Sequence, residues 1–258
     1  MRNIFIIAKR DLRAQFNSPV AYVVIGGTLL LLGVLLFVIQ HTRVGNVSVG
    51  GFWEIDRATM DQMFLYLPPL MSIFVIPAVT MRSLASEKGS GTLELLITMP
   101  VRDSEVILGK YVASCTMVLV LLGLTLLYPI GMFFFPWHLG ALDWGPVWSG
   151  YLGCACFSVA AVGVGMMFSS LTESDVIAFF LTAGALFFLY ALGGLVTFLS
   201  SNSAWGVLSD GLAFVSFQTR YESFARGIID TRAIVYFVSV ATLCLLVSFR
   251  SLESRKWS

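Results

Sequence analysis

Charged side chains are scarce in this sequence of 258 residues. Only 12% of the residues are Asp, Glu, Lys or Arg, whereas soluble domains usually carry about 25%. Because 57% of the residues are apolar, the composition is typical of membrane proteins and argues against an ordinary soluble domain. The net charge is +1 and the basic residues form no long run, so no nucleic-acid partner is expected.

Groups that carry out chemistry are also few. The histidines, His41 and His138, fall in polar loops without partners at metal-ligand spacing. The 4 cysteines lie within apolar runs, where a thiol packs as a small hydrophobic group. The phosphate-binding pattern G-x-x-x-x-G-K-[ST] does not occur. We therefore predict that the chain is not an enzyme by itself, holds no metal or cofactor, and receives any energy for work from another polypeptide.

Long apolar stretches are what the sequence has in abundance. Each of six stretches lacks ionisable side chains and can supply the roughly 20 residues that cross ~30 Å of hydrocarbon. We predict an all-α polytopic membrane protein whose six transmembrane helices lie at about 20–39, 64–81, 111–135, 147–171, 176–199 and 233–249. Proton-coupled carriers and intramembrane hydrolases usually need ionisable groups at depth, so their absence from these spans argues against both classes.

The distribution of basic residues predicts the orientation of the chain. Most of the 16 Lys and Arg residues fall near the two termini and in the 82–110 segment, which an even number of spans puts on one side. Basic residues are enriched on the cytoplasmic side of membrane proteins. We therefore expect a multi-pass protein of the bacterial inner membrane with both termini in the cytoplasm.

Two segments outside the spans are expected to be helical. Residues 2–16 place apolar and basic side chains on adjoining arcs, which is typical of an interfacial helix, although a merely basic tail would also obey the orientation rule. The basic residues of this helix are Arg2, Lys9, Arg10 and Arg13, and the apolar residues are Ile4, Phe5, Ala8, Leu12 and Phe16. The outside segment 200–232 contains an apolar piece at 204–217 that is too short to cross, so a re-entrant or interfacial helix is expected there.

The segment 86–100, between the second and third spans, contains charged residues and residues that interrupt helices. Gly89 and Gly91 interrupt the helix that leaves the second span. Residues 92–98 can then form two helical turns, which Pro100 ends. Leucines at i and i+3 give this short helix an apolar face. Its composition is equally compatible with docking into a groove on a soluble partner and with lying on the bilayer surface.

This segment resembles the signature of permease subunits of type-2 ABC exporters, in which E-K-x-x-G-T-x-E-L-L-x-x-x-P precedes I-x-x-G-K. The matching residues here are Glu87, Lys88, Gly91, Thr92, Glu94, Leu95, Leu96, Pro100, Ile107, Gly109 and Lys110. Segments similar to the gliding-motility-type branch of that family are 9–24, 76–96, 225–239 and 250–257. The permease of the nitrous-oxide-reductase maturation exporter is a looser relative. Loops 40–63 and 138–146 show little family pattern.

The resemblance implies a single transmembrane domain over 1–258 that belongs to a larger complex. Two copies of a separate ABC ATPase subunit, which hold ATP and Mg, would drive it together with a second permease, either a copy or a related chain. Membrane lipid and an accessory membrane protein with a large outside domain are further candidate partners. The complex would export a substrate or transmit force across the membrane. A non-transporting membrane anchor worked by an ATPase, or an ATP-independent channel or carrier, is the alternative.

The resemblance also assigns roles to residues of the 86–100 segment, which it identifies as the coupling helix region. The implied ATPase-coupling residues are Glu87, Gly91, Thr92, Leu93, Glu94, Leu95, Leu96 and Pro100. Leu93 and Leu96 would supply apolar contact, while Glu87 and Glu94 would meet basic groups of the ATPase. For Glu87 a simple helix-end charge is the alternative, and Lys110 is interpreted as a topology-setting charge at the start of the third span.

Overall fold

The computed structural model describes residues 2–37, 61–91, 102–133, 144–200 and 206–254. Within these ranges the chain consists of helices joined by short turns and contains no strand. The predicted all-α polytopic fold is thereby confirmed.

Five helices in the described part of the chain are long and apolar enough to cross a membrane. They are Met63–Gly89, Asp103–Gly131, Trp144–Leu171, Asp175–Ser200 and Thr231–Glu253. Helices α1 (Arg2–Asn17) and α2 (Pro19–Phe37) meet at a bend of 72° and pass the same test only as a pair. The fold therefore has five candidate spans, or six with this bent pair, and α2 occupies the predicted first span.

The second span is built from three consecutive helical pieces, α3 (Asp61–Leu70), the π-helical turn η2 (Met71–Val75) and α4 (Ile76–Gly89). Pro68 and Pro69 lie inside α3 and lack the N–H that a regular helix needs, and the π-turn follows them directly. Helix α4 continues to Gly89, past the predicted boundary at residue 81. It can do so because Arg82 and the charged residues that follow have polar partners on neighbouring helices.

Helix α8 (Trp144–Leu171) is the central helix. It contacts α4, α6 (Asp103–Thr125), α9 (Asp175–Ser200), α11 (Phe217–Ala225) and α12 (Thr231–Ser254). Glycines permit its close contacts. A Cβ atom at Gly150 would lie 2.6 Å from the Phe64 ring, and one at Gly165 would lie 2.3 Å from the Thr80 hydroxyl. Small residues at such contacts let membrane helices approach one another closely. The short helix α7 (Leu127–Phe133) follows α6.

The predicted outside segment contains two short helices, α10 (Gly206–Val215) and α11 (Phe217–Ala225), before the last helix α12 (Thr231–Ser254). Neither short helix is long enough to cross a membrane. Edge-to-face ring contacts join α8 to α11 and α12, because the Phe157 ring of α8 contacts the rings of Phe217, Tyr221 and Phe237. The rings of Phe217, Phe157 and Phe237 are fully buried.

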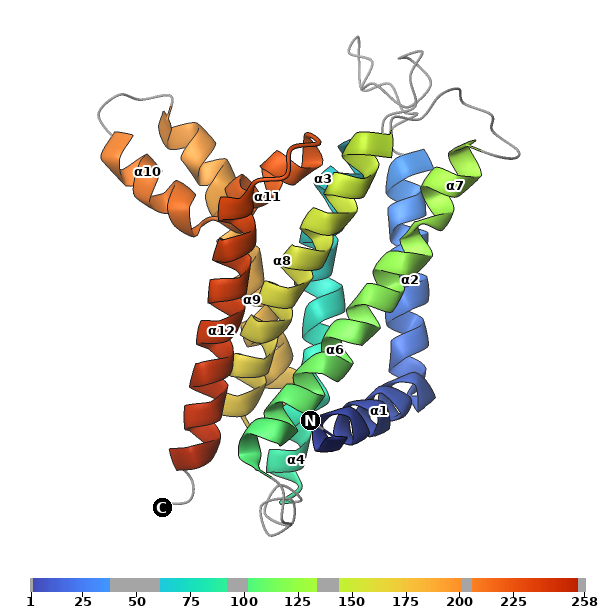
Figure 1. Ribbon diagram of the computed structural model, residues 1–258, viewed down its shortest axis with the longest axis vertical. Coiled ribbons are helices and arrows are strands. Elements are labelled where there is room, and N and C mark those ends of the chain that lie inside the picture. Colours follow the sequence, from blue (N-terminus) through green and yellow to red (C-terminus); the bar gives the residue numbers. More distant parts are fainter. Residues whose placement is uncertain (1, 38–60, 92–101, 134–143, 201–205, 255–258) are drawn as a thin grey trace.

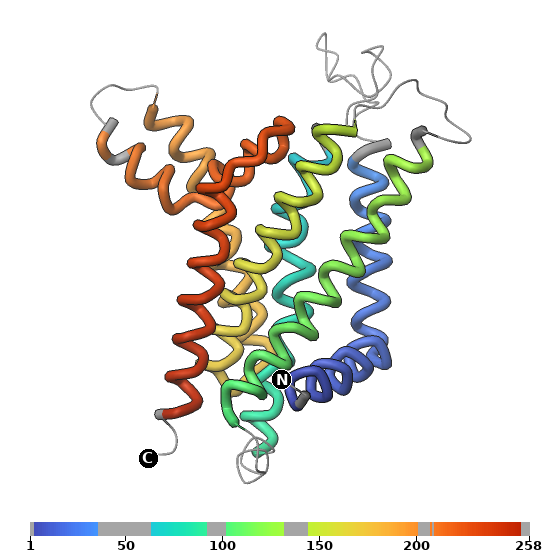
Figure 2. The backbone as a smooth tube through the Cα atoms, in the orientation of Figure 1, coloured from blue at the N-terminus to red at the C-terminus, as the bar shows by residue number. Residues whose placement is uncertain are grey.

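The helices define two ends of the molecule (Figure 1). α1 lies across one end, beside the end of α4 and the start of α6, and α12 finishes at that same end (Figures 1 and 2). α10 and α11 cap the opposite end. Most basic residues of the described part gather at the α1 end, where they are Arg2, Lys9, Arg10, Arg13, Arg82, Lys88, Arg102, Lys110 and Arg250.

Candidate functional site

Helix α1 packs across α6 and makes a close contact at Gly109. A Cβ atom at this glycine would lie 2.8 Å from the Ile7 side chain and 3.2 Å from the Ile4 carbonyl. Ala8 is buried in the same region, whereas Phe5 is 72% exposed. The predicted apolar arc is therefore divided, because Ala8 packs into the bundle and Phe5 faces away from it. Because α1 turns Ile4, Ile7 and Ala8 toward the bundle, Phe5 is left on its outer surface.

The basic residues predicted for the interfacial helix lie in α1, and Lys9, Arg10 and Arg13 are exposed. Arg10 pairs with its neighbour Asp11, with its guanidinium 3.0 Å from Asp11 Oδ1. Asp11 is the sole acidic residue among residues 2–16, and its side chain is only 15% exposed. The basic side chains of α1 are thus exposed, whereas the Asp11 side chain points into the protein.

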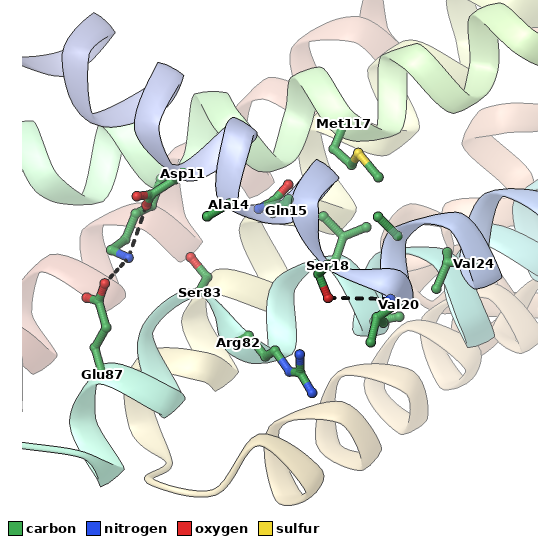
Figure 3. Close-up of a pocket in the computed structure, with 14 residues that line it drawn as sticks. Asp11, Ala14, Gln15, Ser18, Val20, Val24, Arg82, Ser83, Glu87 and Met117 are labelled. Atoms are coloured by element: carbon green, nitrogen blue, oxygen red, sulfur yellow. Dashed lines mark hydrogen bonds and ion pairs between the residues drawn. The ribbon is translucent and has the colours of Figure 1, made fainter.

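Lys110 of α6 joins three helices through ion pairs. Its ammonium lies 2.7 Å from Glu87 Oε1 on α4 and 3.1 Å from Asp11 Oδ2 on α1. Figure 3 shows Asp11 and Glu87 approaching this ammonium from opposite sides. The Lys110 side chain is only 4% exposed. We call Asp11, Glu87 and Lys110 the charge junction.

Burial decides how much the charge junction matters. Ion pairs on a protein surface contribute about 0–1 kcal/mol, because water screens them. Removing one partner from a buried pair costs about 3–5 kcal/mol, because the remaining charge stays in a poorly solvated place. The Lys110 side chain is buried, and the side chains of its partners Asp11 and Glu87 are 15% and 23% exposed. Removing any one side chain of the charge junction is therefore expected to destabilise the fold.

A second set of polar contacts ties α4 to α8. Ser169 is fully buried, and its hydroxyl accepts hydrogen bonds from the backbone N–H groups of Leu84 (3.0 Å) and Ala85 (3.1 Å). The same hydroxyl donates to the Met81 carbonyl at 3.2 Å. Further along, the Lys88 ammonium donates to the Ser170 carbonyl at the end of α8 (2.6 Å). The last turns of α4 are thus fixed to the central helix as well as to α6.

A pocket of about 230 Å³ lies beside the charge junction, between α1, α2, α4 and α6. Figure 3 shows Asp11, Ser83 and Glu87 near one end of it, and Val24 toward the other. Arg82 also lines the pocket, and its guanidinium lies 3.7 Å from Asp175 at the start of α9. This space separates α1 from α4, and the charge junction connects the two helices through Lys110 of α6.

The residues predicted to couple to an ATPase are only partly described. Thr92, Leu93, Glu94, Leu95, Leu96 and Pro100 lie outside the described residues. Gly91 has φ +71°, in the left-handed region that favours glycine, directly after the end of α4. Glu87, which was expected to meet a basic group of the partner, contacts Lys110 of the same chain. Lys110 is part of the charge junction and does more than mark the start of a span.

Sequence reasoning missed Asp11. The signal available was weak: a single acid on an otherwise basic helix. Its partner Lys110 lies far along the chain, and no spacing rule connects the two positions. Near the last span, Arg226 forms a local ion pair with Glu222, and Asp230 caps α12 by accepting a hydrogen bond from the Arg232 N–H (2.9 Å).

Comparison with known families gives one match. Residues 54–249 match the model of the family described as "ABC-2 family transporter protein". This range begins after α2 and ends within α12, so it includes the end of α4, Lys110 and the segment between them, and leaves out α1. No curated protein matches the chain.

Proposed function

The chain belongs to the ABC-2 transporter family and is a multi-pass membrane permease subunit of an ABC transporter; from this premise we propose that a separate ATPase subunit drives it through the segment between α4 and α6. ATP binding and hydrolysis would occur in the partner, which holds ATP and Mg. The work delivered would be substrate export or force transmission across the membrane.

The charge junction is the observation that carries this proposal. The 92–101 segment joins Gly91, at the end of α4, to Arg102, at the start of α6. A load on the segment therefore reaches both helices. Lys110 would pass the load from α4 and α6 to Asp11 on α1, and Ser169 would pass it to α8. Helices at this end would then move together rather than separately.

The orientation of the complex follows from the same end of the molecule. The basic residues gathered there favour the cytoplasmic side, which is where an ATPase meets its nucleotide. α1, with its exposed Lys9, Arg10 and Arg13, would lie at the cytoplasmic headgroups of the inner membrane. Both ends of the chain would then be cytoplasmic, and α10 and α11 would lie on the outside.

The composition of the complex is a further part of the proposal. We expect two permease subunits and two ATPase subunits, with the second permease a copy or a related chain. Segments 9–24, 76–96, 225–239 and 250–257 favour the gliding-motility-type branch of the family. An accessory membrane protein with a large outside domain is the candidate partner at the α10–α11 end.

The contact between α1 and α6 gives the first testable prediction. Gly109→Ala should weaken it, because the added methyl group would meet Ile7 at 2.8 Å and the backbone of Ile4 at 3.2 Å. Overpacking of this kind typically costs about 1–3 kcal/mol. Thermal unfolding of the purified chain in detergent measures the loss. Gly123→Ala in the same helix is the matched control, because nothing lies within 4 Å of its Cβ position; an equal loss in both variants would contradict the contact.

Co-purification followed by transport tests the proposed function. The tagged chain, expressed in its native host, should retain an ABC ATPase subunit through purification. The complex in sealed vesicles should then move a substrate, or an attached accessory protein, only when ATP is present on the side of the α1 end. Purification without any ATPase would contradict the proposal, and ATPase binding without movement of a substrate or partner would favour a static anchor.

A further inference from the structure

At the end opposite α1, a groove of about 740 Å³ opens between α10, α11 and α12. Two arginines line it, Arg220 from α11 and Arg232 from α12. Among the described residues, neither guanidinium has an acidic partner within 4.0 Å. Arginine remains charged at any pH that a protein experiences, so the groove has two positive charges that the described part of the chain does not neutralise.

Aromatic rings hold one of these charges in place. The Arg220 guanidinium lies 5.0 Å from the centre of the Phe214 ring and 5.7 Å from that of Tyr236, within the range of cation–π attraction. The Tyr236 hydroxyl in turn donates to the Val215 carbonyl at 2.6 Å. Arg220 Nε is buried and lacks a hydrogen-bond acceptor among the described residues. These ring contacts use no N–H group of Arg220 as a hydrogen-bond donor to an acid, so the guanidinium can still bind an anion.

The second charge stands at the beginning of α12. Arg232 occupies the first turn of this helix, where the helix dipole already favours a negative charge. Asp230 is the nearby acid in sequence, but its carboxylate caps the helix by accepting from the Arg232 backbone N–H. The two guanidiniums and the helix end together favour an anion over the groove. Guanidinium groups bind the oxygens of phosphate and carboxylate in a bidentate manner, and phosphate is the anionic group that phospholipids carry.

Below the arginines the groove is apolar and follows one face of α12. Arg232, Val235, Tyr236, Ser239, Val240 and Leu243 line it, at the i, i+3, i+4 spacing of a single helical face. Val235 and Leu243 are 67% and 62% exposed. From Arg232 to Leu243 the helix rises about 16 Å at 1.5 Å per residue. This is about half of the ~30 Å hydrocarbon thickness, the depth of one leaflet.

We infer that this groove binds an anionic phospholipid. Its phosphate would lie between Arg220 and Arg232, and one acyl chain would extend along Val235, Val240 and Leu243. The apolar strip favours a lipid over a small soluble phosphate, because only the lipid has an acyl chain that could pack along it. The inference does not depend on the ATPase partner or on the substrate, since the groove lies at the end opposite the charge junction.

Lipid binding to the delipidated full-length chain in detergent tests this inference, with native mass spectrometry as the readout. Dioleoyl phosphatidylglycerol should bind, and dioleoyl phosphatidylcholine, which has no net charge, should bind at least tenfold more weakly. In Arg220→Gln/Arg232→Gln the phosphatidylglycerol affinity should fall about 100-fold, since a hydrogen bond to a charged group is worth about tenfold or more. Arg220→Lys/Arg232→Lys keeps both charges and should retain a clear preference for the anionic lipid even if the glutamine variant folds poorly.

Arg226→Gln is the matched control, because Arg226 lies on the same segment, is 69% exposed, pairs with Glu222 and does not line the groove. Its lipid binding should equal that of the unmodified chain. Equal affinity for the two lipids, or equal loss in Arg226→Gln, would overturn the inference. Binding of glycerol phosphate as tight as that of the lipid would also overturn it in favour of a soluble anion. Failure to bind lipid, together with loss of a dimer in the glutamine variant, would assign the groove to a second copy of the chain.

Discussion

Lys110→Met is expected to lower the free energy of unfolding by about 3–5 kcal/mol, the usual cost of removing one partner from a buried ion pair. Methionine has a similar length but no charge. The substitution leaves the Glu87 carboxylate, 23% exposed, and the Asp11 carboxylate, 15% exposed, without the ammonium between them. Thermal or denaturant unfolding of the purified chain in detergent would measure the loss. A large drop in the yield of folded protein would accompany it.

A neutral version of the whole charge junction separates charge from packing. Asp11→Leu/Glu87→Met/Lys110→Met removes the three charges together, and exchanging a complete buried ionic network for apolar side chains of similar volume is often close to neutral in stability. This triple variant should therefore recover most of the stability that Lys110→Met loses. Arg250→Ala is the surface control, because Arg250 is 82% exposed and pairs only across one helical turn with Glu253; its effect should be small. A Lys110→Met chain as stable as Arg250→Ala would contradict the importance of the charge junction.

Leu93→Asp is expected to abolish the stimulation of ATP turnover by the permease while leaving membrane insertion intact. A leucine buried in a protein–protein contact contributes about 1.5–3 kcal/mol, and the aspartate adds the cost of burying a charge without a partner. The ATPase rate of the co-purified complex measures the effect. The amount of permease in the membrane fraction shows that insertion is unchanged, because residue 93 lies outside the predicted spans.

Glu94→Ala is the companion variant for that experiment. If the Glu94 carboxylate is partly solvated at the contact, its removal should reduce ATP turnover far less than Leu93→Asp does, because exposed ion pairs contribute little. Normal turnover in Leu93→Asp would remove the 92–100 segment from the coupling contact. Combined with Lys110→Met, the two variants distinguish loss of the contact itself from loss of the junction that receives its force.

The helices were predictable from the sequence because hydrocarbon thickness imposes a length on every apolar run. The residues at which the helices end were harder to predict. Helix α4 continues to Gly89 since its charged residues meet partners that become neighbours only after folding, such as Asp175 for Arg82 and the Ser170 carbonyl for Lys88. The kink signals in α3, Pro68 and Pro69, are visible in the sequence, but the π-turn that follows them is not.

The side-chain partners of the site were beyond sequence reasoning for a related reason. Lys110 was interpreted as a charge that fixes topology, and the family resemblance assigned Glu87 to the ATPase contact, because nothing in the sequence shows that the two side chains meet in the fold. Asp11 reaches Lys110 only because Gly109 lets α1 lie close against α6. Likewise, Arg220 of α11 and Arg232 of α12 line the same groove only after the chain has folded.

Cross-linking from the segment between α4 and α6 is the most direct test of the central claim, that this segment receives force from an ATPase in the cytoplasm. Leu96→Cys would be compared with the unmodified chain, whose four cysteines all lie in helices outside the segment. The account predicts a cross-linked adduct between this permease and its ATPase, and labelling by a membrane-impermeant thiol reagent only after the cells are opened. Labelling of residue 96 in intact cells, or a complex that never yields the adduct, would contradict it.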